Sequence, residues 1–540
     1  MRPAVTGTGS SELVMNPDSK GAEGPATGQA APDSLAKRYL FKVSTNVLGL
    51  IISLGSQVII PRSLGPVAFG DFNFLTNFFN QFIGFFDLGT SLAFFTKLSQ
   101  RPKDSGLIGF YLIFMGIMTL LTLGFVGLLH GFGLFPLLLP DQKPFFIILA
   151  AILGLAGWMG QVGAGMGDAF GLTVPMEKIR MVQKIVGFGL VVGLFFSNLL
   201  DLETFFYYNL ILVFLFLAPL CSLLAKNGMA FRYCLRHAWR AFGKYLQEFW
   251  TYCHPLLVYS LASMIINMMD RWLLQRFAGS EQQGFFGLSA SIGAICFLFS
   301  SAMTPLLTRE FSIAFHRNDK PMMASLFRRH IPLLFSITAF FSCFVVVQAP
   351  NVVAIFGGSR FADAAVPVAI MAFYPVYQTY GQLVGAVFYA TGNTGLYRNI
   401  GLTVMLLGMP ATILLVGPSA VFGLDLGATG LALKSVLINF IAVNALLFFI
   451  ARVLEFRYSK YLLHQAGCLA LFLLVGHGCR LMANVLLPGA SRGVLFVVAG
   501  AAYSVSALVI LLTVPLAYGL DRGHTDKLRK LLAPYLGMHR

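Results

Sequence analysis

Long apolar segments separated by short polar loops make up the chain between residues 40 and 518. Each segment is about 20 residues long, the length that an α-helix needs to cross the hydrocarbon core of a bilayer. The sequence therefore predicts an all-α, polytopic integral membrane protein with about fourteen transmembrane helices. Their approximate bounds are 40–61, 72–95, 106–129, 144–166, 179–199, 204–225, 252–274, 284–307, 331–349, 364–389, 399–417, 427–450, 461–485 and 492–518.

Composition agrees with this pattern. The chain is 57% hydrophobic and 11% charged, whereas soluble proteins carry about 25% charged residues. The seven cysteines form no CxxC pair and fall mostly within apolar segments, so we expect small buried core residues.

Lysine and arginine are distributed unevenly between the two predicted sides of the membrane. With the N-terminus inside, the inner segments hold 28 of these residues and the outer segments hold six. Cytoplasmic loops carry an excess of basic residues, so both termini are predicted to be cytoplasmic. The net charge of +16 arises from these loops, and we expect no nucleic-acid partner.

A short motif occurs twice. The run RSLGPVAFG at residues 62–70 matches RFAGSEQQG at residues 276–284 in the spacing of its arginine and two glycines. Each run follows the first span of a block of six, so the two blocks are predicted to be related by an axis along the membrane normal. Arg62 and Arg276 would then be equivalent cations of an outer gate, or headgroup contacts at the outer mouth.

The repeat predicts two six-helix lobes plus two appended helices. The predicted regions are a disordered cytoplasmic tail without a signal peptide (1–36), an N-lobe (37–225), a basic cytoplasmic linker (226–250), a C-lobe (251–451), and two appended helices with a basic cytoplasmic tail (452–540). The linker places aromatic residues between its cations. It is either an amphipathic helix on the anionic inner leaflet or a segment that only sets topology.

Three predicted spans carry polar residues on one helical face. The stripes are Asn73, Asn77, Asn80 and Asp87; Ser260, Ser263, Asn267, Asp270 and Arg271; and Tyr374, Tyr377, Gln378, Gln382 and Gly385. Intramembrane polar groups tend to face a cavity or the bundle interior, so the stripes predict one hydrated central cavity between the lobes. The alternative is that these side chains only join helices by hydrogen bonds.

Four charged residues of the predicted spans are candidates for a functional role. For Asp270 and Arg271, a local ion pair is favoured over contact with a substrate. Asp87 has no adjacent cation, which makes it a candidate titrating carboxylate. Lys434 must meet a carboxylate, an anionic substrate or water, or extend toward the inner face.

Motifs of catalysis and nucleotide hydrolysis are missing from the sequence. It contains no HExxH, GxSxG or P-loop pattern and no acidic cluster for a divalent metal. We therefore expect a carrier that uses no cofactor, and not an enzyme. Its energy would come from a gradient, and coupling to H⁺ or Na⁺ is left open.

Four runs together resemble a known family. They are PRSLGPVAFGDFNF with a following FFDLG, NMMDRWLLQRFAGSEQQGFFGLSASI, IFGGSRFADAAVPVAI and FYATGNTGLYRN. In this order they resemble the Wzx-type polysaccharide-biosynthesis flippases of the multidrug/oligosaccharidyl-lipid/polysaccharide exporter superfamily, over roughly residues 37–450. A central cationic site for a diphosphate is not evident in the N-lobe.

The resemblance implies a two-lobed bundle that works by alternating access. The implied cargo is a polyprenyl-diphosphate-linked oligosaccharide, carried across the bacterial inner membrane for O-antigen or exopolysaccharide synthesis. Implied partners are this lipid-linked substrate, membrane lipids and polysaccharide polymerase or assembly proteins. The alternative is an ion-coupled multidrug or small-cation exporter of the same superfamily. A membrane polymerase or ligase is disfavoured because no outer loop is long enough for a catalytic element.

Overall fold

The computed structural model describes residues 35–102, 104–227, 231–238 and 242–519, and throughout these residues the regular structure is helical. The predicted tail at residues 1–36 lies almost entirely outside them. In the first half of the chain the helices are α1 (Leu35–Asp87), α2 (Thr90–Gln100), α3 (Ser105–Gly131), α4 (Phe135–Leu138), α5 (Pro144–Ala169), α6 (Thr173–Phe196), α7 (Leu202–Lys226) and α8 (Phe231–Ala238).

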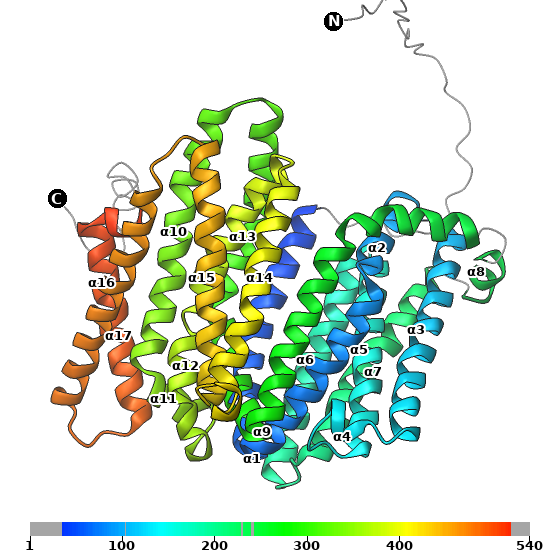
Figure 1. Cartoon of the computed structure of the whole chain (residues 1–540), viewed down its shortest axis with the longest axis horizontal. Helices are drawn as coiled ribbons and strands as arrows, with labels where there is room; N and C mark the ends of the chain where they lie inside the picture. Colours follow the sequence, from blue (N-terminus) through cyan, green and yellow to red (C-terminus); the bar gives the residue numbers. More distant parts are fainter. Residues whose placement is uncertain (1–34, 103, 228–230, 239–241, 520–540) are drawn as a thin grey trace, which may run out of the picture.

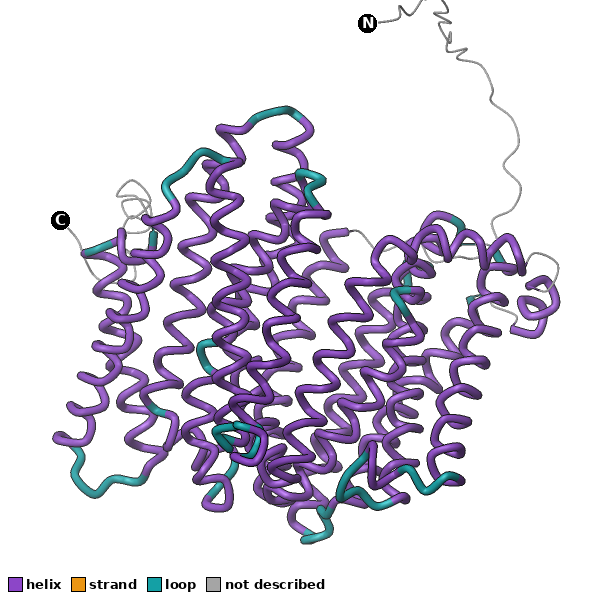
Figure 2. Tube along the Cα trace, viewed as in Figure 1, coloured by secondary structure: helices purple, strands orange, loops and turns teal. Residues whose placement is uncertain are grey.

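The second half begins with the longest helix of the described chain. Its α-helices are α9 (Phe242–His316), α10 (Lys320–Val347), α11 (Ala349–Phe356), α12 (Ala365–Met371), α13 (Tyr374–Ala390), α14 (Thr394–Val416), α15 (Gly427–Val453), α16 (Tyr458–Leu486) and α17 (Arg492–Thr513). Short 3₁₀ turns cover Ser359–Ala364, Ser419–Val421 and Pro515–Tyr518. Figure 2 shows that the loops are short and lie mainly at the two ends of the bundle.

Nine helices of the described chain are long and apolar enough to cross a membrane: α3, α5, α6, α7, α10, α14, α15, α16 and α17. Each corresponds to one predicted span. The other five predicted spans fall on α1 with α2, on α9, and on the pair α12 and α13, all of which are interrupted. The polytopic helical fold is thus confirmed, while the total of fourteen spans stays a prediction.

The interruptions in α1 and α9 occur at the repeated motif. Gly65 has φ 75° and ψ 173°, and Gly279 has φ 77° and ψ −176°. A positive φ is readily adopted only by glycine, so the second motif reproduces the arginine and glycine spacing of the first and also its backbone conformation at the first glycine.

The two lobes pack against each other at these motifs. A Cβ atom on Gly70 would lie 1.8 Å from the carbonyl oxygen of Ser280, and one on Gly284 would lie 2.0 Å from the carbonyl oxygen of Pro66. The contact is reciprocal, because Pro66 and Gly70 occupy the same motif positions as Ser280 and Gly284. In Figure 1 this crossing lies at the lower end of the bundle, where the labels of α1 and α9 meet.

The lobes lie side by side in Figure 1, with α2 to α7 on one side and α10 to α15 on the other. The described chain begins in α1 and ends after α17 at the upper end, which agrees with an even number of crossings. The appended helices α16 and α17 pack on α10. Arg480 donates a hydrogen bond to the Val347 carbonyl at 2.8 Å, and the Tyr503 hydroxyl donates to the Phe340 carbonyl at 3.0 Å. All seven cysteines are free, and all but Cys221 are buried.

Candidate functional site

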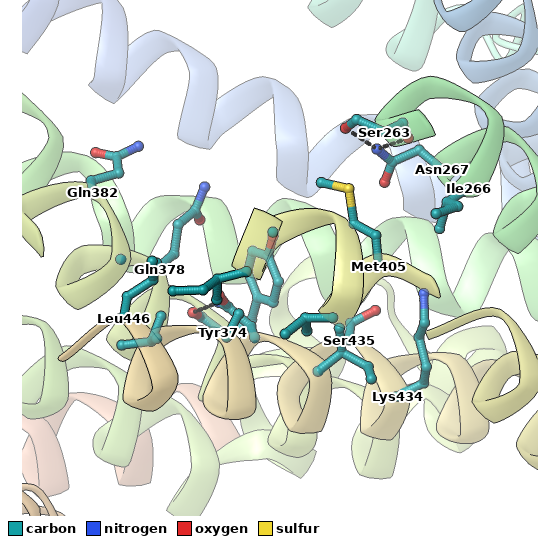
Figure 3. A pocket seen from close by; sticks show the side chains of 18 of the residues that line it. Ser263, Ile266, Asn267, Tyr374, Gln378, Gln382, Met405, Lys434, Ser435 and Leu446 are labelled. Carbon is teal, nitrogen blue, oxygen red and sulfur yellow. Dashed lines mark hydrogen bonds between the residues drawn. The ribbon is translucent and has the colours of Figure 1, made fainter. Parts of the chain in front are cut away.

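A polar cavity of about 420 Å³ lies inside the C-lobe, between α9, α13, α14 and α15 (Figure 3). Four residue positions separate successive side chains on one helical face, which explains how α13 presents Tyr374, Gln378 and Gln382 to it. The polar residues that line it are Ser263, Asn267, Asp270, Tyr374, Gln378, Gln382, Tyr397, Lys434, Ser435 and Asn439. The structure thus brings together residues of two of the three predicted stripes with Lys434, and adds α14, whereas Ser260, Arg271, Tyr377 and Gly385 are not among the lining residues.

The cavity is elongated along α15. Its lining runs from Lys434 to Leu446 on this helix, a distance of about 18 Å at the rise of an α-helix. Amide and hydroxyl groups are spread along the whole length, as Figure 3 shows between Lys434 and Gln382. Such a surface can hydrogen-bond an extended polar ligand.

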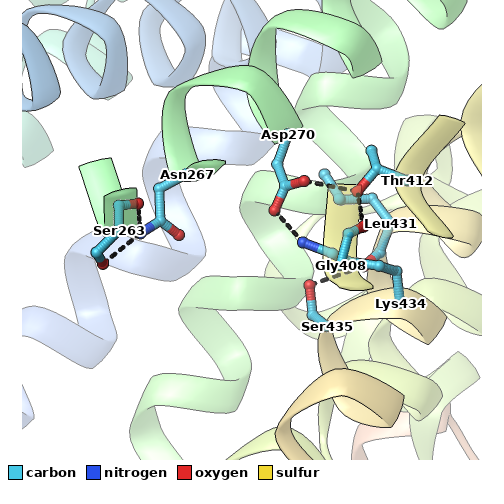
Figure 4. A network of polar contacts seen from close by, with 8 residues as sticks. All are labelled: Ser263, Asn267, Asp270, Gly408, Thr412, Leu431, Lys434 and Ser435. Atoms are coloured by element: carbon cyan, nitrogen blue, oxygen red, sulfur yellow. Dashed lines mark hydrogen bonds and ion pairs between the residues drawn. The ribbon is translucent and has the colours of Figure 1, made fainter. Parts of the chain in front are cut away.

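The charged centre of the cavity is an ion pair between two helices. The Lys434 ammonium contacts the Asp270 carboxylate, and the Thr412 hydroxyl donates to the same carboxylate at 2.6 Å (Figure 4). The Lys434 side chain is 6% exposed and the Asp270 side chain 15% exposed. Gly408 allows this approach, because a Cβ there would lie 3.1 Å from the Lys434 Cε. Of the alternatives given above for Lys434, the structure supports pairing with a carboxylate.

The expected ion pair between Asp270 and Arg271 is wrong. Successive residues of a helix point about 100° apart, and Arg271 extends away from the cavity. Its guanidinium donates to the Gln283 side chain at 3.1 Å and lies 4.3 Å from the centre of the Phe286 ring. Arg271 therefore joins the two halves of α9.

The asparagines of the α1 stripe do not line this cavity. The Asn73 amide donates to the Phe69 carbonyl of its own helix at 2.7 Å and packs beside Gly287 of α9. Asn77 is half-buried, its side-chain oxygen unpartnered within the described chain, and Asn80 is exposed. The prediction of a single cavity lined by all three stripes is therefore incorrect.

Asp87 is held by hydroxyl groups. It accepts hydrogen bonds from Thr90 at 2.9 Å, from the Ser91 hydroxyl at 2.6 Å and from the Tyr111 hydroxyl at 3.3 Å. It also accepts from the Ser91 backbone N–H at 3.1 Å, which satisfies a free donor in the first turn of α2. The Trp158 indole N–H joins the same network by donating to the Ser91 hydroxyl at 3.2 Å. Asp87 thus supports the start of α2 from two positions before its N-cap residue, Gly89.

The predicted outer-gate arginines differ in their surroundings. Arg62 donates to the Ala354 carbonyl of α11 at 2.6 Å, so it connects the N-lobe to the C-lobe. Arg276 is exposed. Both lie at the end of the bundle where Gly70 and Gly284 cross, but their role in gating stays a prediction.

Sequence reasoning missed several polar residues that connect elements. Asp71 accepts a hydrogen bond from Ser280 of the other lobe and one from Gln142 at 2.7 Å. Its position directly after Gly70 was the available signal. Thr412 carried none, because a hydroxyl in an apolar helix usually bonds its own backbone. No group of three or more His, Cys, Asp or Glu suited to a metal occurs within the described chain.

Comparison with solved structures shows the fold. The lipid II flippase MurJ in an inward closed conformation superposes with a TM-score of 0.61 at 13% identity, covering 88% of this chain and 99% of that one. An inward-facing multidrug resistance MATE family transporter of the MOP superfamily gives 0.58 at 15% identity, covering 77% and 98%. Among curated proteins, no sequence matches significantly.

The family profile described as "Polysaccharide biosynthesis protein" matches residues 35–310, slightly more than half of the chain. This match extends from the start of α1 almost to the end of α9, and so includes both copies of the repeated motif. The chain is a multi-pass membrane protein with the fold of the MOP superfamily transporters, and it belongs to the polysaccharide biosynthesis protein family.

Proposed function

We propose that this protein is a flippase that moves a polyprenyl-diphosphate-linked oligosaccharide from the inner to the outer leaflet of the bacterial inner membrane, for surface polysaccharide assembly. The observation that carries the proposal is the elongated polar cavity of the C-lobe in a chain of the polysaccharide biosynthesis family.

The cavity chemistry suits a glycan. Sugar hydroxyls both donate and accept hydrogen bonds, and amide side chains offer both functions. Asn267, Gln378 and Asn439 provide such groups on three different helices. Lys434 is the cation of the cavity lining, and a diphosphate that bound it would compete with Asp270.

The isoprenoid tail of the proposed substrate would contact a separate, apolar surface of the protein. A hollow of about 310 Å³ with an apolar lining lies on a different face of α9 from the polar cavity. At about 100° per residue, its α9 residues Met264, Ile265 and Met268 are centred roughly 150° around the helix from the cavity residues of α9. Phenylalanines of α1 complete it, among them Phe82 and Phe85. Such a hollow suits an isoprenoid chain that remains in the bilayer while the head group enters the bundle.

The crossing of Gly70 and Gly284 supports alternating access. Close backbone contact at the end predicted to be external closes that end in this conformation. With the outer end closed, the substrate would enter the bundle from the inner leaflet.

Deletion of the gene tests the proposal. We expect loss of surface polysaccharide and accumulation of its lipid-linked precursor in the inner leaflet, both restored by the wild-type gene. Unchanged polysaccharide together with new drug sensitivity would contradict the proposal and support the multidrug exporter alternative.

A further inference from the structure

The first turns of α9 lie across the end of the N-lobe that the positive-inside rule assigns to the cytoplasm. Figure 1 shows this part of the helix crossing the upper end of the N-lobe before α9 turns down between the lobes. Pro255 occurs in this region of the sequence, and proline commonly bends a helix. With the predicted topology, the segment would run along the inner surface of the membrane, at the level of the lipid headgroups.

One face of this segment is fixed to the N-lobe. The rings of Tyr245 and Phe249 pack on Phe110 of α3, with centroids 5.8 and 5.2 Å away. The Tyr245 hydroxyl donates to Asp104 at 2.7 Å. These contacts hold the segment in one orientation.

A second face exposes large apolar side chains. Leu246 and Trp250, one turn apart, are 54% and 62% exposed. The neighbouring α8 exposes Tyr233 and Leu235 at the same end of the N-lobe. Tryptophan and tyrosine are enriched where a membrane meets water, so this face fits the boundary between headgroups and acyl chains.

The third face borders a hollow of about 560 Å³ whose lining has more basic side chains than acidic ones. We name it the headgroup hollow, and its lining residues are Lys97, Arg101, Lys244, Gln247, Glu248 and Thr251. Glu248 is shared by two cations, Lys97 at 3.1 Å and Arg101 at 2.6 Å. Lys244 is exposed and, within the described chain, has no carboxylate within 4 Å.

We propose that the headgroup hollow binds the phosphate group of an anionic phospholipid of the inner leaflet, while Leu246 and Trp250 contact its acyl chains. Glu248 contacts Lys97 and Arg101, and Asp104 contacts Arg101 at 3.6 Å. The three cations have more N–H donors than these two carboxylates can accept, so donors remain for phosphate oxygens. The adjacent apolar face selects a lipid rather than free phosphate. This site is independent of the cargo proposed for the C-lobe cavity.

Native mass spectrometry of the purified full-length protein tests the site. The protein is exchanged into micelles that contain equal amounts of phosphatidylglycerol and phosphatidylcholine, and the lipids it retains are counted. The patch variant is K97Q/R101Q/K244Q. The matched control, R317Q/R457Q/K460Q, removes three exposed cations from C-lobe loops and α16 on the same side of the membrane.

We expect the wild type and the control to retain phosphatidylglycerol preferentially. Each neutralised cation should weaken retention about fivefold, because one basic residue near an anionic surface contributes about 1 kcal/mol. The single variant K244Q, which removes no observed ion pair, should show one such step even if the triple variant folds poorly. E248Q should strengthen retention, since it frees Lys97 and leaves Arg101 with one carboxylate, Asp104 at 3.6 Å, instead of two.

Two results would overturn the site. One is equal retention of phosphatidylglycerol by wild type and K244Q together with no effect of E248Q. The other is retention of an added polyprenyl diphosphate without retention of phosphatidylglycerol, which would assign the hollow to the transported substrate.

Discussion

The two lobes hold their intramembrane carboxylates in different ways. In the C-lobe, Asp270 is compensated by a full positive charge on another helix, Lys434 of α15. In the N-lobe, Asp87 is compensated by hydroxyl groups, those of Thr90 and Ser91 at the start of α2 and that of Tyr111 on α3. Asp270 thus connects helices around a cavity, whereas Asp87 terminates one helix and begins another. A polar residue in a membrane span therefore indicates a binding cavity only when its partners come from other helices around an open volume.

The largest effect should come from removing the cation of the C-lobe pair. Lys434→Met leaves Asp270 as a buried charge without its counter-ion, which costs about 3–5 kcal/mol. Thermal unfolding of the purified protein measures this loss. The double variant Asp270→Asn/Lys434→Met should regain most of the stability, and Lys460→Met, at an exposed position, should lose little. A Lys434→Met protein as stable as the wild type would show that the pair contributes nothing.

The crossing of the motifs gives the next largest effect. Gly284→Ala places a methyl group 2.0 Å from the Pro66 carbonyl oxygen, so the lobes must separate there at a cost of about 1–3 kcal/mol. Spin labels at Val67 and Arg276, both exposed, should report longer distances. Gly124→Ala is the control, because its methyl group would meet no atom within 4 Å. Identical distance distributions in the two variants would refute the close contact.

The hydroxyl network of the N-lobe should give a smaller loss. Asp87→Asn keeps one side-chain oxygen but converts charge-assisted hydrogen bonds into neutral ones, which costs about 1 kcal/mol. The unfolding temperature should fall less than in Lys434→Met. A fall as large as that one would mean that Asp87 carries an interaction beyond its role at the start of α2.

The smallest effect concerns the cytoplasmic carboxylate Glu248. Burial raises the pKa of Glu248, but hydrogen bonds from Arg101 and Lys97 outweigh it and hold this pKa below its usual value of 4.5. Because its pKa is lowered, ionised Glu248 adds its full contribution to the free energy of unfolding above pH 4.5, and this contribution is lost as pH falls through the lowered pKa. Glu248→Gln should therefore lower stability by about 0.2–1 kcal/mol near neutral pH. The difference from the wild type should vanish in acid, and a difference that persists there would contradict this explanation.

The fold was largely predictable because its signals are local. Apolar length alone located nine helices, and the glycine spacing of the two motifs revealed the repeat whose backbone the structure reproduces at Gly65 and Gly279. The reciprocal packing of Gly70 and Gly284 was not predictable, because it joins residues 214 positions apart through backbone atoms that any sequence contains.

The candidate site was predictable only in part. Helical periodicity grouped Asn267 with one predicted stripe and Gln378 and Gln382 with another, and all three residues line the C-lobe cavity. It could not decide which inward faces meet, so it merged the N-lobe stripe with the C-lobe cavity. Adjacency in sequence likewise suggested Arg271 as the partner of Asp270, whereas the partner is 164 residues away. Side chains one position apart on a helix diverge, and distant helices supply the contacts.

Transport of a labelled polyprenyl-diphosphate-linked oligosaccharide in reconstituted vesicles tests the central claim most directly. The cavity variant Asn267→Ala/Gln378→Ala is compared with the N-lobe variant Asn77→Ala/Asn80→Ala, which removes the same two-amide complement outside the cavity. We predict at least a tenfold loss of transport for the cavity variant, since loss of about 1.4 kcal/mol of binding corresponds to tenfold, and near wild-type transport for the N-lobe variant. Equal transport by both variants, or a greater loss in the N-lobe variant, would contradict the assignment of the C-lobe cavity as the substrate site.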